Sequence, residues 1–479
     1  MNFVIQGREP LSVFRFFEEI SAIPRPSYHE SGIADYLVSF AKARGLECYR
    51  DATNNVLIKK PATMGKENIP AVLFQGHTDM VCEKNADVEH DFLTDPLKLY
   101  VDGKMLRAKG TTLGADNGIA VATMLALLDG EIPEHPAMEC LFTTAEEVGL
   151  DGANNFDYRL ISARRLVNMD SEALGRITAG CAGGLRSDIA LPCRVKNFAG
   201  RAIRVAVSGL MGGHSGENIN SGRANANKLM GRLLAALYGE QKFALVSLSG
   251  GSKDNAIPRE CEAILAVCDA DAAIDCLSEH AAEIANELSQ DDKGFRVICE
   301  DVEDAAVMLD EASTLRAITL LSTVQNGVIT MSQQVKGLVE FSRNLGVIRT
   351  EGEQIIFTLS TRSSIESQLD ASVDELNLFA KLLGASINHH GRYPGWSYAK
   401  TSAIRDAYLS AYREVMGGDA AIDVIHAGLE CGVISSKIPD MDMISVGPDM
   451  FDIHSPDEAL DLDSVEKFWQ IVERLIAKL

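Results

Sequence analysis

The chain has 479 residues, of which 46% are hydrophobic and 24% charged, and its formal net charge is -23. This length exceeds what one hydrophobic core usually supports, so two or three domains are expected. The negative charge argues against nucleic acid and anionic membranes as partners. No stretch approaches the roughly 18 continuous apolar residues of a membrane helix.

The ten cysteines form no CxxC pair, and most lie in apolar contexts such as MECLF around Cys140. This usage favours reduced, buried thiols over disulfides or a thiolate metal site. The N-terminal segment MNFVIQGREPLSVFRFFEEI lacks the basic and apolar regions of a signal peptide. We therefore expect a soluble, cytoplasmic protein.

Helix and strand patterns alternate in the first part of the chain. Residues 9–20 and 30–45 are typical of amphipathic helices, the second closed by Gly45, and NGIAVATMLALLDG predicts a third helix directly after Asp116. The runs AVLFQG, CLFTTA and RLVNM are typical of buried strands. This alternation predicts an α/β domain with a mostly parallel sheet flanked by helices.

The pattern changes after the glycine-rich stretch 179–184. The segments RAIRVAVSGL, ANANKLMGRLLAAL, FALVSLSG, RECEAILAVCDA and DCLSEHAAEIANEL predict the order β-α-β-β-α. A looser version follows, with the strand FRVICEDV, helices near 311–323 and 372–384, and a hairpin between these helices. We expect an inserted α+β domain of two ferredoxin-like units, with helices on one face of an antiparallel sheet. The predicted domains are 1–186 and 401–479 together, interrupted by 187–400.

The alternation of predicted helices and strands returns after Trp396. The tetrad Ser455-Pro456-Asp457-Glu458 has the form of a capping box, with serine at the cap, proline at the first position and glutamate three residues on. We expect the last helix to begin there, which places His454 at a strand-to-helix junction.

Histidine and carboxylate residues follow the predicted strands and loops. They are His77, Asp79, Asp116, Glu146, Glu147, Asp170 and His454. The carboxyl ends of strands in an open α/β sheet meet in one crevice, so we expect these side chains to converge. Two imidazoles with several carboxylates suit a two-zinc hydrolase.

Three of these positions allow more than one interpretation. His77 and Asp79 share one side of an extended segment, so Asp79 can orient the His77 ring, but an isolated HxD is also a common structural pattern. Asp116 in GADNG also suits a helix N-cap. Glu146 and Glu147 form either a solvated acidic loop or a pair in which one binds metal and the other moves protons.

The motifs HTDMV, GADNGIAVA, TAEEVG, NMDSE, GGHSG, NAIPRE and DIHSPDE span essentially the whole chain. They resemble the motif series of the M20 family of dinuclear zinc metallopeptidases, and most closely its aminoacyl-histidine dipeptidase branch. The resemblance implies His77, Asp116 and Asp170 on one zinc ion, and Asp116, Glu147 and His454 on a second. Co²⁺ or Mn²⁺ can share such ligands.

The resemblance also implies roles beside the metal ligands. Glu146 would be the general base, with Asp79 positioning His77, and a cis peptide is expected between Asp116 and Asn117. In the inserted domain, which would act as a lid, His214 would polarise the scissile carbonyl. Substrate-binding residues implied there are Asn255 and Arg362 for the carboxylate end, with Arg259 as a weaker candidate, and Gly428 through its backbone.

The implied activity is hydrolysis of unblocked dipeptides, with Xaa-His substrates including β-alanyl-histidine, by a homodimer. Whether His214 acts in its own chain or across the dimer is open. The same site would also suit a deacylase or amidase acting on N-acylated amino acids, or a tripeptidase. A non-catalytic metal-binding scaffold is the remaining alternative, against which the presence of both Glu146 and Glu147 argues.

Overall fold

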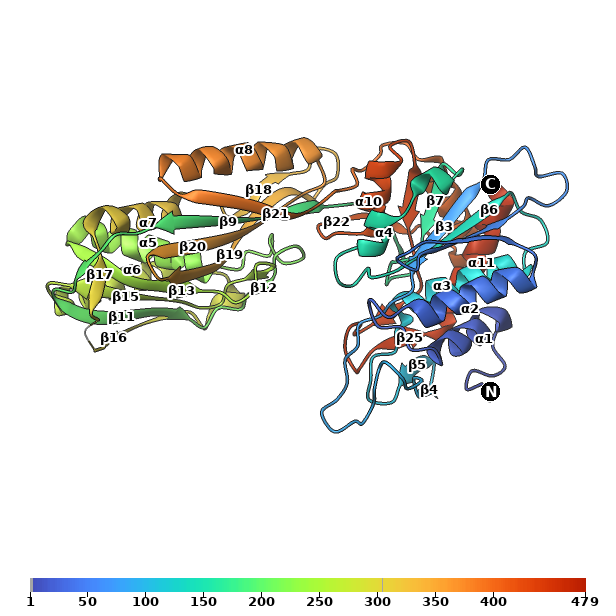
Figure 1. Ribbon diagram of the computed structural model, residues 1–479, viewed down its shortest axis with the longest axis horizontal. Helices are drawn as coiled ribbons and strands as arrows, with labels where there is room; N and C mark the ends of the chain where they lie inside the picture. The colour runs from blue at the N-terminus through green and yellow to red at the C-terminus, as the bar shows by residue number, and fades with distance from the viewer. Residues whose placement is uncertain (1–2, 304) are drawn as a thin grey trace. The chain divides into compact units, whose positions relative to one another are not determined.

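The computed structural model describes residues 3–303 and 305–479, and its contacts divide the chain into two compact units (Figure 1). Unit 1 comprises the residues up to Cys181, Trp396–Val424 and Leu429–Leu479. Unit 2 comprises Ala182–Gly395 and Ile425–Gly428. The roles of catalytic domain and lid that the sequence assigns to the predicted domains stay predictions.

Unit 1 is built on an eight-stranded sheet. Across the sheet the strands are β1 (Glu47–Arg50), β2 (Val56–Lys60), β6 (Met138–Thr143), β3 (Val72–His77), β7 (Arg165–Asn168), β23 (Asp442–Ser445), β8 (Arg176–Cys181) and β22 (Ala421–Ile425). The central strands β6, β3, β7 and β23 pair in parallel, whereas β1–β2, β2–β6 and β23–β8 are antiparallel. The predicted parallel sheet with flanking helices is confirmed for the centre of the unit.

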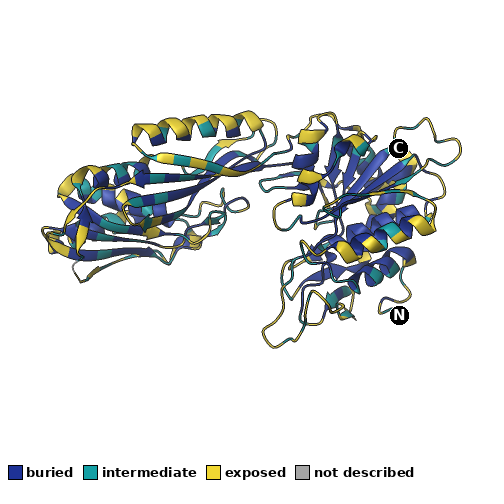
Figure 2. Ribbon diagram, in the orientation of Figure 1, coloured by how far each residue is buried: buried dark blue, intermediate teal, exposed yellow. Residues whose placement is uncertain are grey.

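One face of this sheet shares a hydrophobic core with five helices, α1 (Leu11–Ser21), α2 (Ser31–Ala43), α3 (Ala115–Asp129), α9 (Ala403–Met416) and α11 (Leu462–Lys478). Strand residues such as Val72 and Phe74 point into that core, so Leu73 and Gln75 point to the other face, because side chains alternate along a strand. That other face carries α10 (Glu430–Lys437), which packs on α4 (Asp151–Asn155). Figure 2 shows the central strands of this sheet as buried and the outer face of α2 as exposed.

A smaller four-stranded sheet completes unit 1. Its strands are β24 (Met450–Phe451), β25 (Ala459–Asp461), β5 (Met105–Ala108) and β4 (Leu99–Asp102), and a short 3-10 helix spans Tyr158–Leu160. Among the described residues, no helix has both the length and the apolar character needed to cross a bilayer.

The predicted start of the last helix at Ser455 is wrong. The helix α11 begins at Leu462, and the carboxylate of Asp461 caps it by accepting hydrogen bonds from the backbone N–H groups of Asp463 (3.0 Å) and Ser464 (3.4 Å). Strand β25 lies between Ser455 and this helix. The Ser455 hydroxyl accepts from the N–H of Asp457 at 3.2 Å and so caps only a turn.

Unit 2 contains a nine-stranded sheet in which every described strand pair is antiparallel. Its strands in order are β16 (Arg296–Asp301), β11 (Arg201–Ser208), β15 (Cys261–Val267), β13 (Phe243–Gly250), β19 (Val339–Glu351), β20 (Gln354–Ser363), β9 (Gly183–Pro192) and β21 (Ser386–Tyr393), with β18 (Gly327–Met331) also paired to β19. Two small ribbons pair β10 (Val195–Asn197) with β17 (Val307–Leu309), and β12 (Gly213–His214) with β14 (Ala256–Ile257).

Four helices share a single core with one face of the unit 2 sheet. They are α5 (Ala226–Glu240), α6 (Ala270–Ala285), α7 (Glu311–Thr323) and α8 (Glu366–Leu382), and a 3-10 turn spans Gln290–Asp292. Asn225, Asp269 and Asp310 cap the first three by accepting a backbone N–H at the helix start. The predicted antiparallel sheet with helices on one face agrees with this arrangement. Its division into two ferredoxin-like units stays a prediction, since the strands of both halves join in one sheet.

Candidate functional site

The ends of the parallel strands in unit 1 bring the predicted metal-binding residues together. His77 ends β3, while Glu146 and Asp170 lie in the loops just beyond β6 and β7. Ligand atoms within 4.8 Å of one another form three groups, which are His77 with Asp116 and Asp170, His77 with Glu146 and Glu147, and Asp116 with Glu147 and His454. The groups share members, so together they form one cluster.

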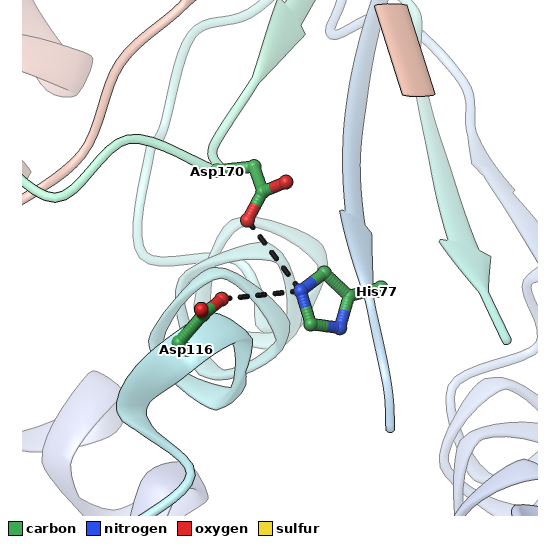
Figure 3. A group of neighbouring side chains, drawn as sticks. All are labelled: His77, Asp116 and Asp170. Carbon is green, nitrogen blue, oxygen red and sulfur yellow. Dashed lines mark hydrogen bonds and ion pairs between the residues drawn. The ribbon is translucent and has the colours of Figure 1, made fainter. Parts of the chain in front are cut away.

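Asp116 offers one oxygen to each of two histidines. The His77 Nε2 lies 3.1 Å from Asp116 Oδ1 and 3.5 Å from Asp170 Oδ1 (Figure 3). The His454 Nε2 lies 3.2 Å from Asp116 Oδ2 and 3.2 Å from Glu147 Oε2. This is the arrangement expected of a carboxylate that bridges two cations.

The donor set fits divalent cations. Each ring nitrogen faces two carboxylate oxygens, and the second oxygen of Glu147, Oε1, is buried and has no hydrogen-bond partner among the described residues. A buried charged oxygen without a partner costs free energy unless a cation or a donor reaches it. Imidazole and carboxylate ligands suit Zn²⁺, and Co²⁺ or Mn²⁺ can use the same set.

The carboxylates raise the pKa of both histidines. Hydrogen bonds to Asp116 and Glu147 raise the pKa of His454 to about 10. Burial lowers the pKa of His77, but Asp170 and Asp116 outweigh this and raise it well above its ordinary value. Burial likewise acts against the ionised form of Asp116, but His454 and His77 hold its pKa well below the usual range. Without metal, the ring nitrogens therefore carry protons at neutral pH.

Asp79 holds both the His77 ring and the loop that carries the two glutamates. Its fully buried carboxylate lies 3.4 Å from His77 Nδ1 and accepts the N–H groups of Glu146 (3.1 Å) and Glu147 (3.3 Å). The Ser27 hydroxyl donates to it at 2.7 Å. The predicted role of Asp79 in orienting His77 stays a prediction, which this geometry supports.

Glu146 belongs to the cluster through its group with His77 and Glu147, but no ion pair joins it to either histidine among the described contacts. Burial raises its pKa well above the ordinary glutamate value, although His77 opposes this. A carboxylate with a raised pKa can accept and return a proton near neutral pH.

The backbone around Asp116 departs from a regular helix start. The Asp116–Asn117 peptide is cis, as expected, and both residues have non-helical dihedral angles at the start of α3. Asp116 is not a side-chain N-cap, because Gly114 occupies that position with φ +66° and makes no side-chain cap. The Asn117 side chain donates to Asp170 Oδ1 at 2.9 Å.

Unit 2 holds the other predicted residues, in one neighbourhood. His214 lies in β12, next to Ser215, whose N–H donates to the carbonyl of Asn255 at 2.9 Å. Burial and then the charge of Arg362 lower the pKa of His214. Arg362 Nη1 donates to the hydroxyl of Tyr393 at 2.9 Å. A Cβ on Gly428 would lie 2.9 Å from the same tyrosine ring, so glycine permits close packing there.

Two further polar side chains of unit 2, those of His426 and Arg259, make hydrogen bonds within that unit. His426 Nε2 lies 2.7 Å from the hydroxyl of Ser342, and burial with the charge of Arg362 lowers the pKa of His426 to about 3. Arg259, the weaker sequence candidate, instead donates to the carbonyl of Leu210 at 3.2 Å. Tyr393 carried no recognisable sequence signal.

A buried polar network beneath the loops that carry the predicted metal ligands also left no recognisable sequence signal. Glu430 Oε2 accepts from Gln75 Nε2 (2.5 Å) and from the Thr143 hydroxyl (2.7 Å), and Gln75 Oε1 accepts from Asn168 at 2.7 Å. All four side chains are fully buried. Gln75 precedes His77 by two residues and Asn168 precedes Asp170 by two, so the network ties together the strands that carry these ligands.

Comparisons with known proteins agree on one family. The model of peptidase family M20/M25/M40 matches residues 73–478. The cytosol non-specific dipeptidase of Escherichia coli K12 is 39% identical over 474 residues, covering 98% of both chains. The crystal structure of aminoacylhistidine dipeptidase from Vibrio alginolyticus has a TM-score of 0.93 at 40% identity, covering 98% of this chain and 96% of that one. Aminopeptidase PepT from Bacillus cereus shares the fold, with a TM-score of 0.57 at 16% identity and 98% coverage of both chains.

We predict that metal affinity rises steeply with pH. His77 and His454 both have raised pKa values, so both must lose a proton before their ring nitrogens can bind a cation. Each proton released increases affinity about tenfold per pH unit below the relevant pKa. Competition titrations of Zn²⁺ against a chromogenic chelator at pH 6, 7 and 8 measure the slope. His454→Ala should reduce the slope of log affinity against pH by about one proton. An affinity that does not change with pH would contradict cation binding by the two imidazoles.

We also predict that Glu430→Gln becomes more stabilising as pH rises. Burial raises the pKa of Glu430 to about 7. The stability that this carboxyl contributes is therefore present below its unfolded pKa and is lost as pH rises through about 7. The neutral amide escapes that loss, so the difference in Tm between variant and parent should increase from pH 5 to pH 8 in chelator.

Glu430→Leu is the matched comparison for the network. It leaves Gln75 and Thr143 without their acceptor and should be about 1–3 kcal/mol less stable than Glu430→Gln at every pH. A Tm difference for Glu430→Gln that falls as pH rises would show that the carboxyl is stabilised in its charged form.

Proposed function

This chain belongs to peptidase family M20/M25/M40 and is a peptide-bond hydrolase, and on that premise we propose that it is a dinuclear zinc dipeptidase acting on unblocked dipeptides. The observation that carries the proposal is the shared carboxylate of Asp116, which gives one oxygen to the group around His77 and the other to the group around His454. Glu146 has a carboxylate oxygen within 4.8 Å of ligand atoms of His77 and Glu147, one residue from each of these groups.

The residues that would hold the two cations follow from these groups. His77, Asp116 and Asp170 would hold one, and Asp116, Glu147 and His454 the other. When bound, the cations supply Lewis acidity, which polarises a peptide carbonyl and makes water acidic enough to attack near neutral pH.

Glu146 performs the proton transfers in this proposal. It takes a proton from the attacking water and gives it to the amine that leaves when the peptide C–N bond breaks. Its raised pKa makes the carboxylate a stronger base toward the attacking water than an ordinary glutamate, and its protonated form then carries that proton to the leaving amine. Asp79 keeps the Glu146 backbone and the His77 ring in place through its own hydrogen bonds.

We propose that residues of unit 2 bind the substrate. His214 donates a hydrogen bond to the carbonyl oxygen as negative charge develops on it, which is worth about 10²–10³ in rate. Its lowered pKa keeps the ring neutral, so one nitrogen can donate while the other accepts. Arg362 and Asn255 hold the substrate carboxylate, since the guanidinium fork matches a carboxylate. The backbone at Gly428 adds contacts.

The relatives support a substrate preference and a location. The similarity to an aminoacylhistidine dipeptidase supports Xaa-His dipeptides as substrates of this chain. We include β-alanyl-histidine among these substrates. The name of the Escherichia coli relative supports a cytosolic location, as do the ten free cysteines of this chain. A homodimer is proposed on the branch resemblance alone.

The function is tested with a panel of an Xaa-His dipeptide, a plain dipeptide, a tripeptide and an N-acetyl amino acid. We expect cleavage of the dipeptides only, lost on chelation and regained with Zn²⁺. Glu146→Gln should lower kcat by about 10²–10⁴ while Zn²⁺ affinity stays close to that of the parent. Cleavage of the blocked substrate alone would indicate a deacylase, and cleavage of the tripeptide alone a tripeptidase. No cleavage by the metal-loaded protein would favour a scaffold.

The role of Arg362 is tested by comparing a dipeptide with its C-terminal amide. Arg362→Ala should raise KM for the dipeptide about 10–100-fold, because charge-assisted hydrogen bonds to the carboxylate are lost. The amide lacks that carboxylate, so its KM should change little. Tyr393→Phe keeps the arginine and removes only its hydroxyl partner, so its effect should be about tenfold or less. Equal KM increases for both substrates would contradict carboxylate binding by Arg362.

A further inference from the structure

Glu458 lies just before β25 and not in a helix, and its carboxylate binds the loop that carries Asp116. Its Oε2 accepts the backbone N–H groups of Leu113 (2.7 Å) and Gly114 (2.9 Å). Its Oε1 accepts those of Ala115 (2.8 Å) and Asp116 (3.4 Å). These four consecutive donors precede or open α3, whose N-cap residue Gly114 has no side chain to accept them. A buried carboxylate with four backbone donors fixes the path of the chain at this point.

Arg25 binds the carbonyl groups of the same loop. Its Nη2 donates to the carbonyl of Gly114 at 2.6 Å, and its Nη1 donates to those of Thr78 (2.9 Å) and Asp79 (3.2 Å). The arginine therefore joins the segment after His77 to the segment before Asp116. Glu458 and Arg25 are each only 2% exposed.

The loop is shaped to admit this arginine. A Cβ added to Gly114 would lie 2.5 Å from Arg25 Nη2, and one added to Gly118 would lie 2.7 Å from it. Gly114 also has φ +66°, which side chains disfavour. Gly114 donates its N–H to Glu458 and accepts at its carbonyl from Arg25, so two opposite charges hold one residue.

We propose that Glu458 and Arg25 are positioning residues that hold the Asp116 carboxylate between the two cation groups. Glu458 follows the ligand His454 by four residues, so one short segment supplies a metal ligand and also fixes the loop of the shared ligand. The two residues act through the peptide backbone and touch neither substrate nor cation. The inference rests on the proposed function only in taking the cluster as a cation site.

The test is the Zn²⁺ affinity of the full chain, measured by competition with a chromogenic chelator. Glu458→Gln keeps one acceptor oxygen but turns an NH₂ group toward two backbone donors. We expect its Zn²⁺ affinity to fall about 10–100-fold, as for residues that orient metal ligands. We also expect a lower kcat at saturating Zn²⁺, with little change in the KM for a dipeptide.

Glu139→Gln is the matched control. Glu139 is 3% exposed and accepts the N–H groups of Ser162 and Ala163 at 3.1 Å, but it lies at the other end of β6. We expect a comparable drop in Tm with Zn²⁺ affinity within about twofold of the parent. An equal loss of affinity in both variants, or none in Glu458→Gln, would overturn the proposal.

Two further variants keep the test decisive if Glu458→Gln does not fold. Glu458→Asp retains both oxygens but withdraws them by one methylene, and Arg25→Lys retains the charge but loses the fork that spans three carbonyls. For a similar drop in Tm, each variant should lose more Zn²⁺ affinity than Glu139→Gln does. Parent affinity in both would refute the positioning role. If the parent chain binds no Zn²⁺, the assignment of the cluster as a cation site is wrong, and this inference is wrong with it. If the parent binds Zn²⁺ but cleaves no peptide, only the proposed dipeptidase activity is contradicted.

Discussion

Negative charge crowded into one buried place is the constraint on which unit 1 depends. In the described part of the chain, Asp116, Glu146, Glu147 and Asp170 meet around two histidines. Burial raises the pKa of Asp170 and of Glu146, so the cluster resists full ionisation without added positive charge. Protons on the imidazoles supply part of that charge, and divalent cations can supply more. The position that a cation would need is therefore a position that favours a proton.

Because side chains alternate along a strand, one face of the sheet packs against the helices and the other face holds the polar network that positions the strand ends. Along β3, Val72 and Phe74 enter the hydrophobic core with the helices, whereas Gln75 faces the opposite side and meets Asn168 and Glu430. Hydrophobic packing fixes the sheet as a body, and the polar network fixes the ends of its neighbouring strands relative to each other. Directional hydrogen bonds suit this second task, since they specify register and spacing where apolar contacts do not.

The sequence predicted what short-range patterns encode. The parallel strands, most helices and the converging side chains follow from apolar runs and from residues placed just after them. The long-range partners left no such signal, since Gln75 and Glu430 are 355 residues apart and Arg25 and Gly114 are 89 apart. The tetrad at Ser455 shows the limit most clearly. Its glutamate is three residues after a serine, as in a capping box. The carboxylate oxygens of that glutamate nevertheless accept backbone N–H groups that lie 342–345 residues earlier in the chain.

The order of the segments along the chain has a consequence for biosynthesis. Unit 1 is interrupted by unit 2, and β22, β23 and α11 all follow that interruption. Domains generally fold as they emerge from the ribosome, so the whole of Ala182–Gly395 can fold while the sheet of unit 1 still lacks two strands. His454 is the last of the candidate metal-binding residues to be made, and Glu458, which accepts the backbone N–H groups of the Asp116 loop, follows it. The candidate cation cluster and the side chain that holds its central loop are thus assembled only after unit 2 has been synthesised.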